Sequence, residues 1–364
     1  MRISDLKTVL WQMLLLVMSF VALSAVLLGL SLLVLPPPDR ITPIDTFRAG
    51  ATVYSTPPRL IYYGRKSLRN EGPKVILLGS SNTQVGFDRQ ALADRMEGMA
   101  VHNLGIGDAN ITEIAQIADL ALSSIGSDRI KDQVFVIGIW YATFVDNANR
   151  WSSGDALRFE TDIDRERYRY GFQRGGVNGP KVWISDRDAD IAAVLVHPLI
   201  ALEKGIRIVT ADLRSLFFVR PPRIDTQTRN TMTPSKAQKA AALAYRAGYM
   251  KSERLSGEQY DVLDRLVRDL TGQGAHVVVA DLPIPDWHAQ GLPYHADHRE
   301  RIAQVVAGLT GVERFDYVDL RHLDDPDSFY DDAHVRPRDL GPWVDALAAR
   351  LETFAPTRIT SATD

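Results

Sequence analysis

The sequence contains no cysteine among its 364 residues. This absence excludes disulfides, a thiolate nucleophile and a zinc site built on cysteine ligands. The chain also lacks an excess of basic residues, since its net charge is −3 at pH 7. Composition therefore gives no support to a nucleic-acid partner, and we expect neither a nucleic acid nor a cofactor.

Length and composition place the chain among ordinary globular proteins. Charged residues make up 24% of it, which is typical of a folded domain. A chain of 364 residues is long enough for two domains, or for one large domain that carries an insertion.

The N-terminus carries one long hydrophobic run over residues 9–35. It contains no charged residue, and Gln12 is its one strongly polar side chain. The run is long enough to cross a hydrocarbon core of about 30 Å. A cleaved signal peptide is the alternative, but the run exceeds the usual apolar region of about 7–15 residues and no small-x-small cleavage site follows it. We therefore expect residues 1–35 to form a single-pass membrane anchor.

Charge near this run barely decides its orientation. Arg2 and Lys7 precede the run, whereas Arg40, Arg48 and Arg59 follow it. Positive charges therefore flank both ends, and the positive-inside rule gives little preference. The side of the membrane that holds the rest of the chain has to be inferred from other features.

An alternation of strands and helices follows. Short apolar runs bounded by turn residues predict buried strands over residues 75–78, 101–104, 134–139, 276–280 and 315–320. Apolar residues at helical spacing predict helices over residues 111–125, 260–270, 301–309 and 340–354. Alternating strands and helices are typical of parallel strands joined by crossovers. The expected fold class is α/β, a three-layer domain around a parallel five-stranded sheet.

The same patterns predict the domain boundaries. Residues 36–73 have turn residues and little periodicity, so we expect a membrane-proximal linker. The α/β domain is expected over 74–356, followed by a tail at 357–364. Between the third and fourth strands, about 147–274 form a long, partly helical insertion, which we expect to cover an edge or the mouth of the site.

Polar residues follow the first predicted strand in the sequence VILLGSSNTQVGFD. Ser80, Ser81 and Asn82 come directly after Gly79, where the strand ends. In an open parallel sheet, ligands bind at the carboxyl ends of the strands. A serine that acts as a nucleophile needs a base, and the base needs a group that fixes its tautomer. The alternative for this segment is a capped turn at a strand end, and Asn82 fits such a cap as well as a place in the pocket.

The best candidate for the base lies after the last strand. In the segment SFYDDAHVRP, Asp331 precedes His334 by three residues on a loop that leads into the final helix. This spacing lets Asp331 hold one imidazole nitrogen while the other addresses Ser81. The alternative is a helix-entry loop with a surface histidine.

Together these motifs resemble the SGNH/GDSL hydrolase superfamily. The resemblance covers about residues 75–139 and 274–354 and leaves the insertion unmatched. It implies a flavodoxin-like domain with Ser81 as nucleophile and Asp331 and His334 completing a triad. It also implies an oxyanion hole formed by the backbone N–H groups of Ser81 and Gly107, with Gly105 as the alternative to Gly107.

Two positions depart from the family pattern. Ser80 stands where most members carry aspartate, and Trp140 stands near the place of the oxyanion asparagine. This variant is similar to membrane-anchored members, such as the DltD proteins of teichoic acid D-alanylation and relatives of alginate O-acetyltransferases. That resemblance implies an extracytoplasmic (periplasmic) domain on the plasma or inner membrane. It also implies a membrane-bound O-acyltransferase (MBOAT) as partner, and a glycan or acyl donor as substrate.

A second group of polar residues follows the fourth predicted strand. Asp286, His288, His295, Asp297 and His298 lie within one short segment. Imidazole and carboxylate groups suit zinc or manganese, but the spacing matches no recognised ligand pattern, so we expect no metal. We expect Asp286 and His288 to border the pocket together with Trp140, and His288 is the substitute base if His334 is not the base.

Three functions remain compatible with the sequence. The first is a membrane-tethered O-acyltransferase or esterase that modifies a cell-envelope or exported polysaccharide through an acyl-serine. The second is a lipase or thioesterase that uses the same triad alone. The third is a non-catalytic scaffold that partners the membrane-bound O-acyltransferase.

Overall fold

The computed structural model describes most of the chain. The described residues are 3–35, 41–49, 57–145, 173–174, 181–182, 186–217, 226–250 and 255–354. The charged first part of the predicted insertion, residues 147–172, and the predicted tail lie outside the described residues.

A five-stranded sheet forms the centre of the domain. Its strands are β1 (Lys74–Gly79), β2 (Ala100–Asn103), β3 (Gln133–Ile139), β6 (His276–Asp281) and β7 (Phe315–Asp319). Neighbouring strands are all parallel, in the order β2-β1-β3-β6-β7. The predicted α/β class and parallel five-stranded sheet are therefore confirmed. The apolar runs of β1 and β3 are buried along their whole length, as expected for strands covered on both sides.

Successive residues of each strand contribute to two hydrophobic clusters, because side chains alternate between the faces of a sheet. Ile76 and Leu78 belong to a cluster with α6 (Ile111–Ile125) and α12 (Gly257–Gly272). Val75 and Leu77 belong to the other, which includes Trp343 and Leu347 of α15 (Gly341–Leu351).

The remaining helices of the domain body are α4 (Ser81–Gly86), α5 (Arg89–Arg95), α13 (Asp286–Gly291) and α14 (Tyr294–Gly308). Short 3-10 turns complete it: η3 (Ser127–Asp132), η4 (Tyr141–Phe144), η5 (Pro326–Ser328), η6 (Pro337–Asp339) and η7 (Glu352–Phe354).

The segment before β1 contributes to the core. It forms α2 (Thr46–Ala49), α3 (Pro57–Gly64) and η2 (Arg65–Arg69). Leu60 and Tyr63 of α3 are buried in the same cluster as α6. The described part of the predicted linker is therefore packed against the domain.

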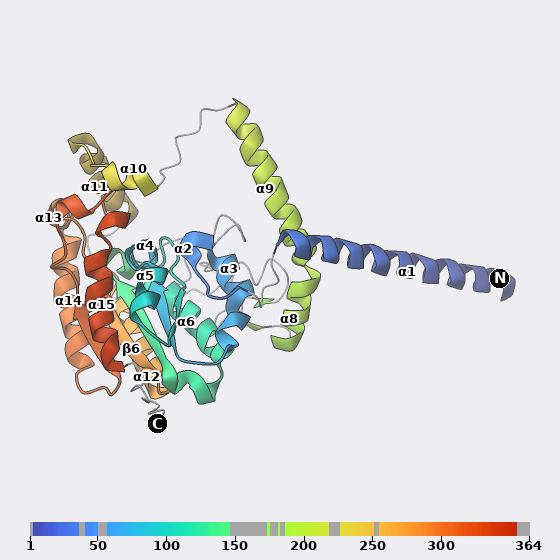
Figure 1. Ribbon diagram of the computed structural model, residues 1–364, viewed down its shortest axis with the longest axis horizontal. Coiled ribbons are helices and arrows are strands. Elements are labelled where there is room, and N and C mark those ends of the chain that lie inside the picture. Colours follow the sequence, from blue (N-terminus) through green and yellow to red (C-terminus); the bar gives the residue numbers. More distant parts are fainter. Residues whose placement is uncertain are drawn as a thin grey trace, which may run out of the picture.

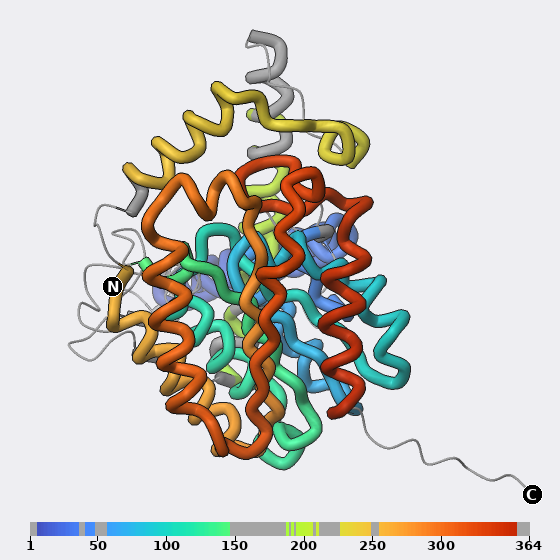
Figure 2. Tube along the Cα trace, turned by 90° about the vertical axis from the view of Figure 1, so that its left-hand side faces the viewer, coloured from blue at the N-terminus to red at the C-terminus, as the bar shows by residue number. Residues whose placement is uncertain are grey.

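Described parts of the insertion form helices and one small sheet. The helices are α8 (Asp186–Leu195), α9 (His197–Phe217), α10 (Thr226–Thr231) and α11 (Lys236–Met250). The sheet is an antiparallel pair, β4 (Gln173–Arg174) and β5 (Lys181–Val182). Figure 2 shows α10 and α11, in yellow, lying across one end of the domain.

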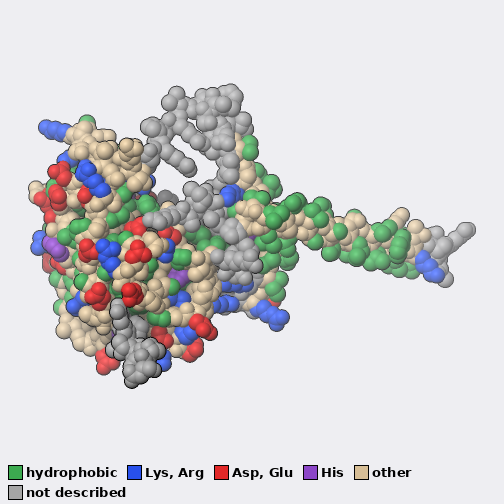
Figure 3. Space-filling model, viewed as in Figure 1, with side chains coloured by type: hydrophobic (Ala, Val, Ile, Leu, Met, Phe, Trp, Pro, Cys, Tyr) green, Lys and Arg blue, Asp and Glu red, His purple; other side chains and the backbone are tan. Residues whose placement is uncertain are grey.

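One N-terminal helix, α1 (Ile3–Val34), is long and apolar enough to span a membrane over Leu6–Val34. It projects away from the domain, and α8 and α9 run across its inner end (Figure 1). The space-filling view shows hydrophobic side chains along α1 that continue onto these helices (Figure 3).

Gly79 allows β1 to turn sharply into α4. Its φ is +154°, and an added Cβ would lie 2.0 Å from Thr83 Oγ1 and 2.8 Å from the carbonyl oxygen of Gly138. The strand therefore ends in a turn that has no room for a side chain.

We expect Gly79→Ala to lower the free energy of unfolding by about 3 kcal/mol. The new methyl group would clash with Thr83, and alanine would be strained at the positive φ of this position. Thermal unfolding of the full chain in detergent measures the effect as a fall in Tm. Gly272→Ala is the control, since a Cβ at Gly272 meets no atom within 4 Å. Equal Tm values for both variants would contradict this account of the turn.

Candidate active site

The predicted serines lie at the point where the strand order reverses. The chain passes from β1 to β2 on one side and then to β3 on the other, so the strand order reverses between β1 and β3. In open α/β sheets, ligands bind outside the carboxyl ends of the strands at such a point. Gly79 pairs with Gly138 in the sheet, so Ser80 directly follows the end of β1, and Trp140, one residue further along, directly follows the end of β3. Ser81 is the first residue of α4.

Asp331 and His334 form the predicted pair. Asp331 Oδ2 lies 2.8 Å from His334 Nδ1, and Oδ1 accepts hydrogen bonds from the backbone N–H groups of Ala333 (2.9 Å) and His334 (2.8 Å). Because a carboxylate can only accept, Nδ1 carries the proton and Nε2 is left as the basic nitrogen. Tyr330 stacks on the His334 ring, with centroids 5.7 Å apart.

The charge state of Asp331 follows from these contacts. Burial alone would raise the pKa of Asp331, but the hydrogen bond and charge of His334 and the two backbone N–H groups outweigh it, so the pKa lies below its usual range. Asp331 is therefore ionised at neutral pH and can stabilise an imidazolium.

Asn82 connects this loop to the serine turn. Its Nδ2 donates a hydrogen bond of 3.0 Å to the carbonyl oxygen of Ala333, the residue before His334. Asn82 is also the residue after Ser81 and is 1% exposed. This buried hydrogen bond therefore joins the neighbour of the predicted nucleophile, Ser81, to the neighbour of the predicted base, His334.

The Ser81 hydroxyl makes no hydrogen bond to any described residue, His334 included. Catalytic hydrogen bonds are often long in the absence of substrate. The first hydrogen bond of α4 runs from Gln84 N–H to the Ser80 carbonyl, so the Ser81 N–H has no partner within the helix. The direct Ser81–His334 contact stays a prediction.

The two glycines of the predicted oxyanion turn differ in their surroundings. The Gly105 N–H donates to Asn103 Oδ1 (3.1 Å), and its carbonyl accepts from Thr46 Oγ1 (2.6 Å). An added Cβ at Gly107 would meet no atom within 4 Å, so Gly107 borders open space. The oxyanion role of Gly107, or of Gly105 in its place, stays a prediction.

Trp140, which we expected to border the pocket, makes one defined hydrogen bond. Its indole Nε1 donates a hydrogen bond of 2.9 Å to Ser80 Oγ, and both residues are buried. Ser80 and Trp140 are thus partners in one buried contact. It joins the ends of β1 and β3 directly beside Ser81.

His288 is buried, and both of its ring nitrogens are bound. Nδ1 lies 2.5 Å from the carbonyl oxygen of Asp332 and Nε2 lies 2.6 Å from Tyr141 Oη. A carbonyl only accepts, so Nδ1 carries the proton and Nε2 accepts from the tyrosine. Burial lowers the pKa of His288 and raises that of Tyr141, which keeps both neutral. This arrangement leaves no nitrogen of His288 for a substrate and makes it a support for the Asp332 backbone.

Asp286 lies apart from this network. It is exposed at the start of α13, near Asp324, and the pKa of the Asp324 carboxyl is raised first by burial and then by Asp286. Among the described residues, no group of three or more histidine, aspartate or glutamate side chains is placed to hold a metal ion.

The insertion brings Arg246 of α11 into the site. Arg246 Nε donates to Asp332 Oδ2 (2.7 Å), and its guanidinium lies 5.1 Å from the centre of the Trp140 ring. Burial alone would lower the pKa of Arg246, but Asp332 and Asp108 raise it, so it stays charged. Sequence reasoning missed this residue, because one arginine in an alanine-rich helix carries no signal of its tertiary partners.

A second contact of the insertion holds the other side of the loop. Arg336, two residues after His334, donates to the carbonyl oxygen of Met232 (3.0 Å) and to Thr233 Oγ1 (3.1 Å). The insertion therefore binds the Asp331–His334 loop on both flanks.

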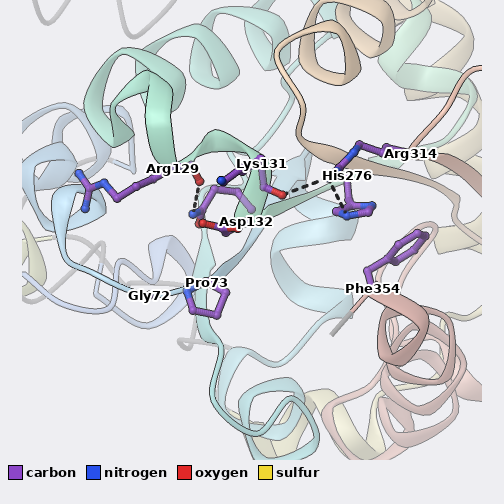
Figure 4. A pocket seen from close by; sticks show the side chains of 9 residues that line it. Gly72, Pro73, Arg129, Lys131, Asp132, His276, Arg314 and Phe354 are labelled. Carbon is purple, nitrogen blue, oxygen red and sulfur yellow. Dashed lines mark hydrogen bonds between the residues drawn. The ribbon is translucent and has the colours of Figure 1, made fainter. Parts of the chain in front are cut away.

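A cavity of about 340 Å³ lies at the opposite end of the sheet, beside the first residues of β1, β3 and β6 (Figure 4). Arg314 projects there, but its guanidinium donates to the carbonyl oxygens of Lys131 and Gly274 and to His276 Nε2. The guanidinium of Arg314 is thus used in structural hydrogen bonds. The cavity is separate from the candidate site.

Comparison of the chain with protein-family models and with curated proteins finds no match.

We expect Arg246→Gln to lower the free energy of unfolding by about 2 kcal/mol, because it leaves the Asp332 carboxylate without its charged donor. A double-mutant cycle with Asp332→Asn tests this, with a coupling energy of about 1 kcal/mol or more. The Arg268–Asp264 pair, exposed on α12, is the matched control and should couple much more weakly, because solvent screens its charges. Additive effects of Arg246→Gln and Asp332→Asn would contradict the buried pair.

The Asp331 contacts predict a pH dependence of stability. Its folded pKa is depressed, so its contribution is complete above the unfolded value of about 3.9 and is lost as the pH falls through the lower folded pKa. We expect Asp331→Asn to be less stable than wild type at pH 7 and the difference to shrink below about pH 4. Unfolding curves at several pH values measure it. A difference independent of pH would show that Asp331 is not an ionised acceptor.

Proposed function

We propose that the protein is a membrane-tethered SGNH-type acyl-ester enzyme that works through an acyl-Ser81 intermediate. The proposal includes a three-layer, flavodoxin-like domain. It is supported by the strand order and by the hydrophobic clusters on the two faces of the sheet. The hydrogen bond from Asn82 to the Ala333 carbonyl supports the functional part, because it joins the residue after Ser81 to the residue before His334.

The chemistry follows from the charge states of the three groups. His334 Nε2 takes the proton of Ser81 Oγ as the oxygen attacks an ester or thioester carbonyl, and Asp331 stabilises the imidazolium that forms. The N–H groups of Ser81 and Gly107 stabilise the developing oxyanion. His334 then gives the proton to the leaving oxygen or sulfur, and the acyl group stays on Ser81.

The second half of the reaction repeats these roles. His334 removes a proton from an acceptor hydroxyl, which attacks the acyl-serine and releases Ser81 with its proton returned by His334. A sugar hydroxyl as acceptor gives O-acyl transfer, and water gives hydrolysis. We infer transfer to a cell-envelope or exported polysaccharide, on the resemblance to membrane-anchored acyltransferase partners. The domain then lies outside the cytoplasm, beside a multi-span O-acyltransferase.

The oxyanion hole in this proposal has backbone donors and no asparagine. The Trp140 indole N–H is engaged with Ser80 and gives no bond to substrate. Loss of one oxyanion donor costs about 10²–10³ in kcat in enzymes that have it, so we expect slow turnover on small esters. Slow hydrolysis suits an enzyme that passes its acyl group to a bound acceptor.

Covalent labelling with a fluorophosphonate probe tests the nucleophile. We expect Ser81→Ala to abolish labelling and His334→Ala to slow it by about 10²-fold or more, the usual contribution of a general base. Ser80→Ala is the matched control and should keep its labelling, because its hydroxyl serves Trp140.

The outcomes separate the candidate functions. Labelling that survives Ser81→Ala would refute the assignment of the nucleophile. A folded wild-type protein that does not label would instead support a scaffold in which Ser81 is not used.

A further inference from the structure

A continuous row of hydrophobic side chains is exposed along α8 and α9. Its members are 39–68% exposed, far more than the apolar residues of the domain core. They are Ile191, Val194, Leu195, Leu199, Leu202, Ile206 and Val209. We call this row the apolar face of α8 and α9. On an α-helix at 100° per residue, its four members on α9 fall within an arc of about 80°.

The other flank of α9 is fixed to the protein. Ile200 is 1% exposed within the core, and Glu203 forms a salt bridge of 3.1 Å with Arg59, which is fully buried on α3. The helix therefore has a defined rotation about its axis. The exposed row results from that rotation, because the polar contact and the buried apolar residue are both on the domain side.

The position of α9 is fixed relative to α1 as well. His197 Nδ1 lies 2.9 Å from Ser31 Oγ, three residues before the end of α1. The apolar span Leu6–Val34 is 29 residues long, or about 43 Å at 1.5 Å per residue, against a hydrocarbon core of about 30 Å. The last turns of α1 thus reach the headgroup region, and His197 lies at that depth.

The direction of these helices completes the geometry. Figure 1 shows α8 and α9 running across the end of α1 rather than along it. When α1 crosses a bilayer near its normal, α8 and α9 lie close to the membrane plane. A helix in that plane, with one flank packed on the protein and an exposed apolar flank, can bury its apolar flank in the interface as interfacial membrane helices do.

We propose that the apolar face of α8 and α9 lies in the headgroup–acyl boundary of a phospholipid bilayer and forms a second membrane contact beside α1. The ligand is the lipid surface itself. Continuity with α1 selects lipid, because the row passes the end of the membrane-spanning helix at His197. This contact fixes the tilt and rotation of the domain, which a single helix cannot do. It does not depend on the chemistry of Ser81.

Site-directed spin labelling tests the contact in the full chain, which has no native cysteine to remove. Leu202→Cys and Ile206→Cys are labelled in phosphatidylcholine–phosphatidylglycerol nanodiscs that hold one chain each. Power saturation then compares collisions with oxygen, which enters lipid, and with a water-soluble nickel chelate. Leu16→Cys in α1 is the control for the membrane interior, and Ala244→Cys, exposed on α11 away from α1, is the control for water.

We expect both labels on α9 to show an oxygen-to-nickel ratio several-fold above that of the Ala244 label and below that of the Leu16 label. The double substitution Leu202→Glu with Ile206→Glu should lower the ratio of a label at Leu199→Cys towards the water control. Ala244→Glu should leave that label unchanged.

A ratio at Leu202→Cys and Ile206→Cys equal to the water control would overturn the proposal. Labels that are open to nickel in discs of lipid and this chain, but protected when a multi-span membrane protein is added, would also overturn it and assign the face to a protein partner. Neither result bears on fluorophosphonate labelling of Ser81, so failures of the two proposals are distinguishable.

Discussion

The Asp331 carboxylate is the group on which the candidate site depends. One of its oxygens accepts from the N–H groups of Ala333 and His334, which shapes the loop, and the other holds His334 Nδ1. The same loop shape presents the Ala333 carbonyl to Asn82, beside Ser81. One ionised group thus fixes the tautomer of His334 and shapes the loop that Asn82 binds from 251 residues away. Without this carboxylate, the two backbone N–H groups of the loop would lose their acceptor, and the proton of His334 would no longer be held on Nδ1.

The regular elements were predictable because their signals are local. Strand and helix periods, such as that of α6 over Ile111–Ile125, are properties of neighbouring residues. The serine turn and the Asp331–His334 spacing were predictable for the same reason. The Trp140–Ser80 bond, the Tyr141–His288 pair and the Arg246–Asp332 salt bridge were not, because each joins residues at least 60 positions apart and follows from tertiary packing.

The insertion gains a physical role from these contacts. Arg246 of the insertion binds Asp332, and Arg336 donates to Met232 and Thr233 of the insertion, so the insertion contacts the chain both before and after His334. At the other end of the insertion, α9 contacts α1 through His197 and Ser31. The same inserted segment therefore contacts both the candidate site and the N-terminal helix α1. In the account proposed here, it sets the distance and direction of the site from the membrane surface.

The central claim is an acyl group carried by Ser81, and mass spectrometry of the trapped intermediate tests it most directly. Trypsin cleavage after Lys74 and Arg89 yields one peptide that contains both Ser80 and Ser81. After brief reaction with an activated acetyl ester and an acid quench, the account predicts an acetylated peptide whose fragments place the group on Ser81, with none in Asp331→Asn at the same time point. Acetyl on Ser80, or equal acetylation in Asp331→Asn, would contradict it.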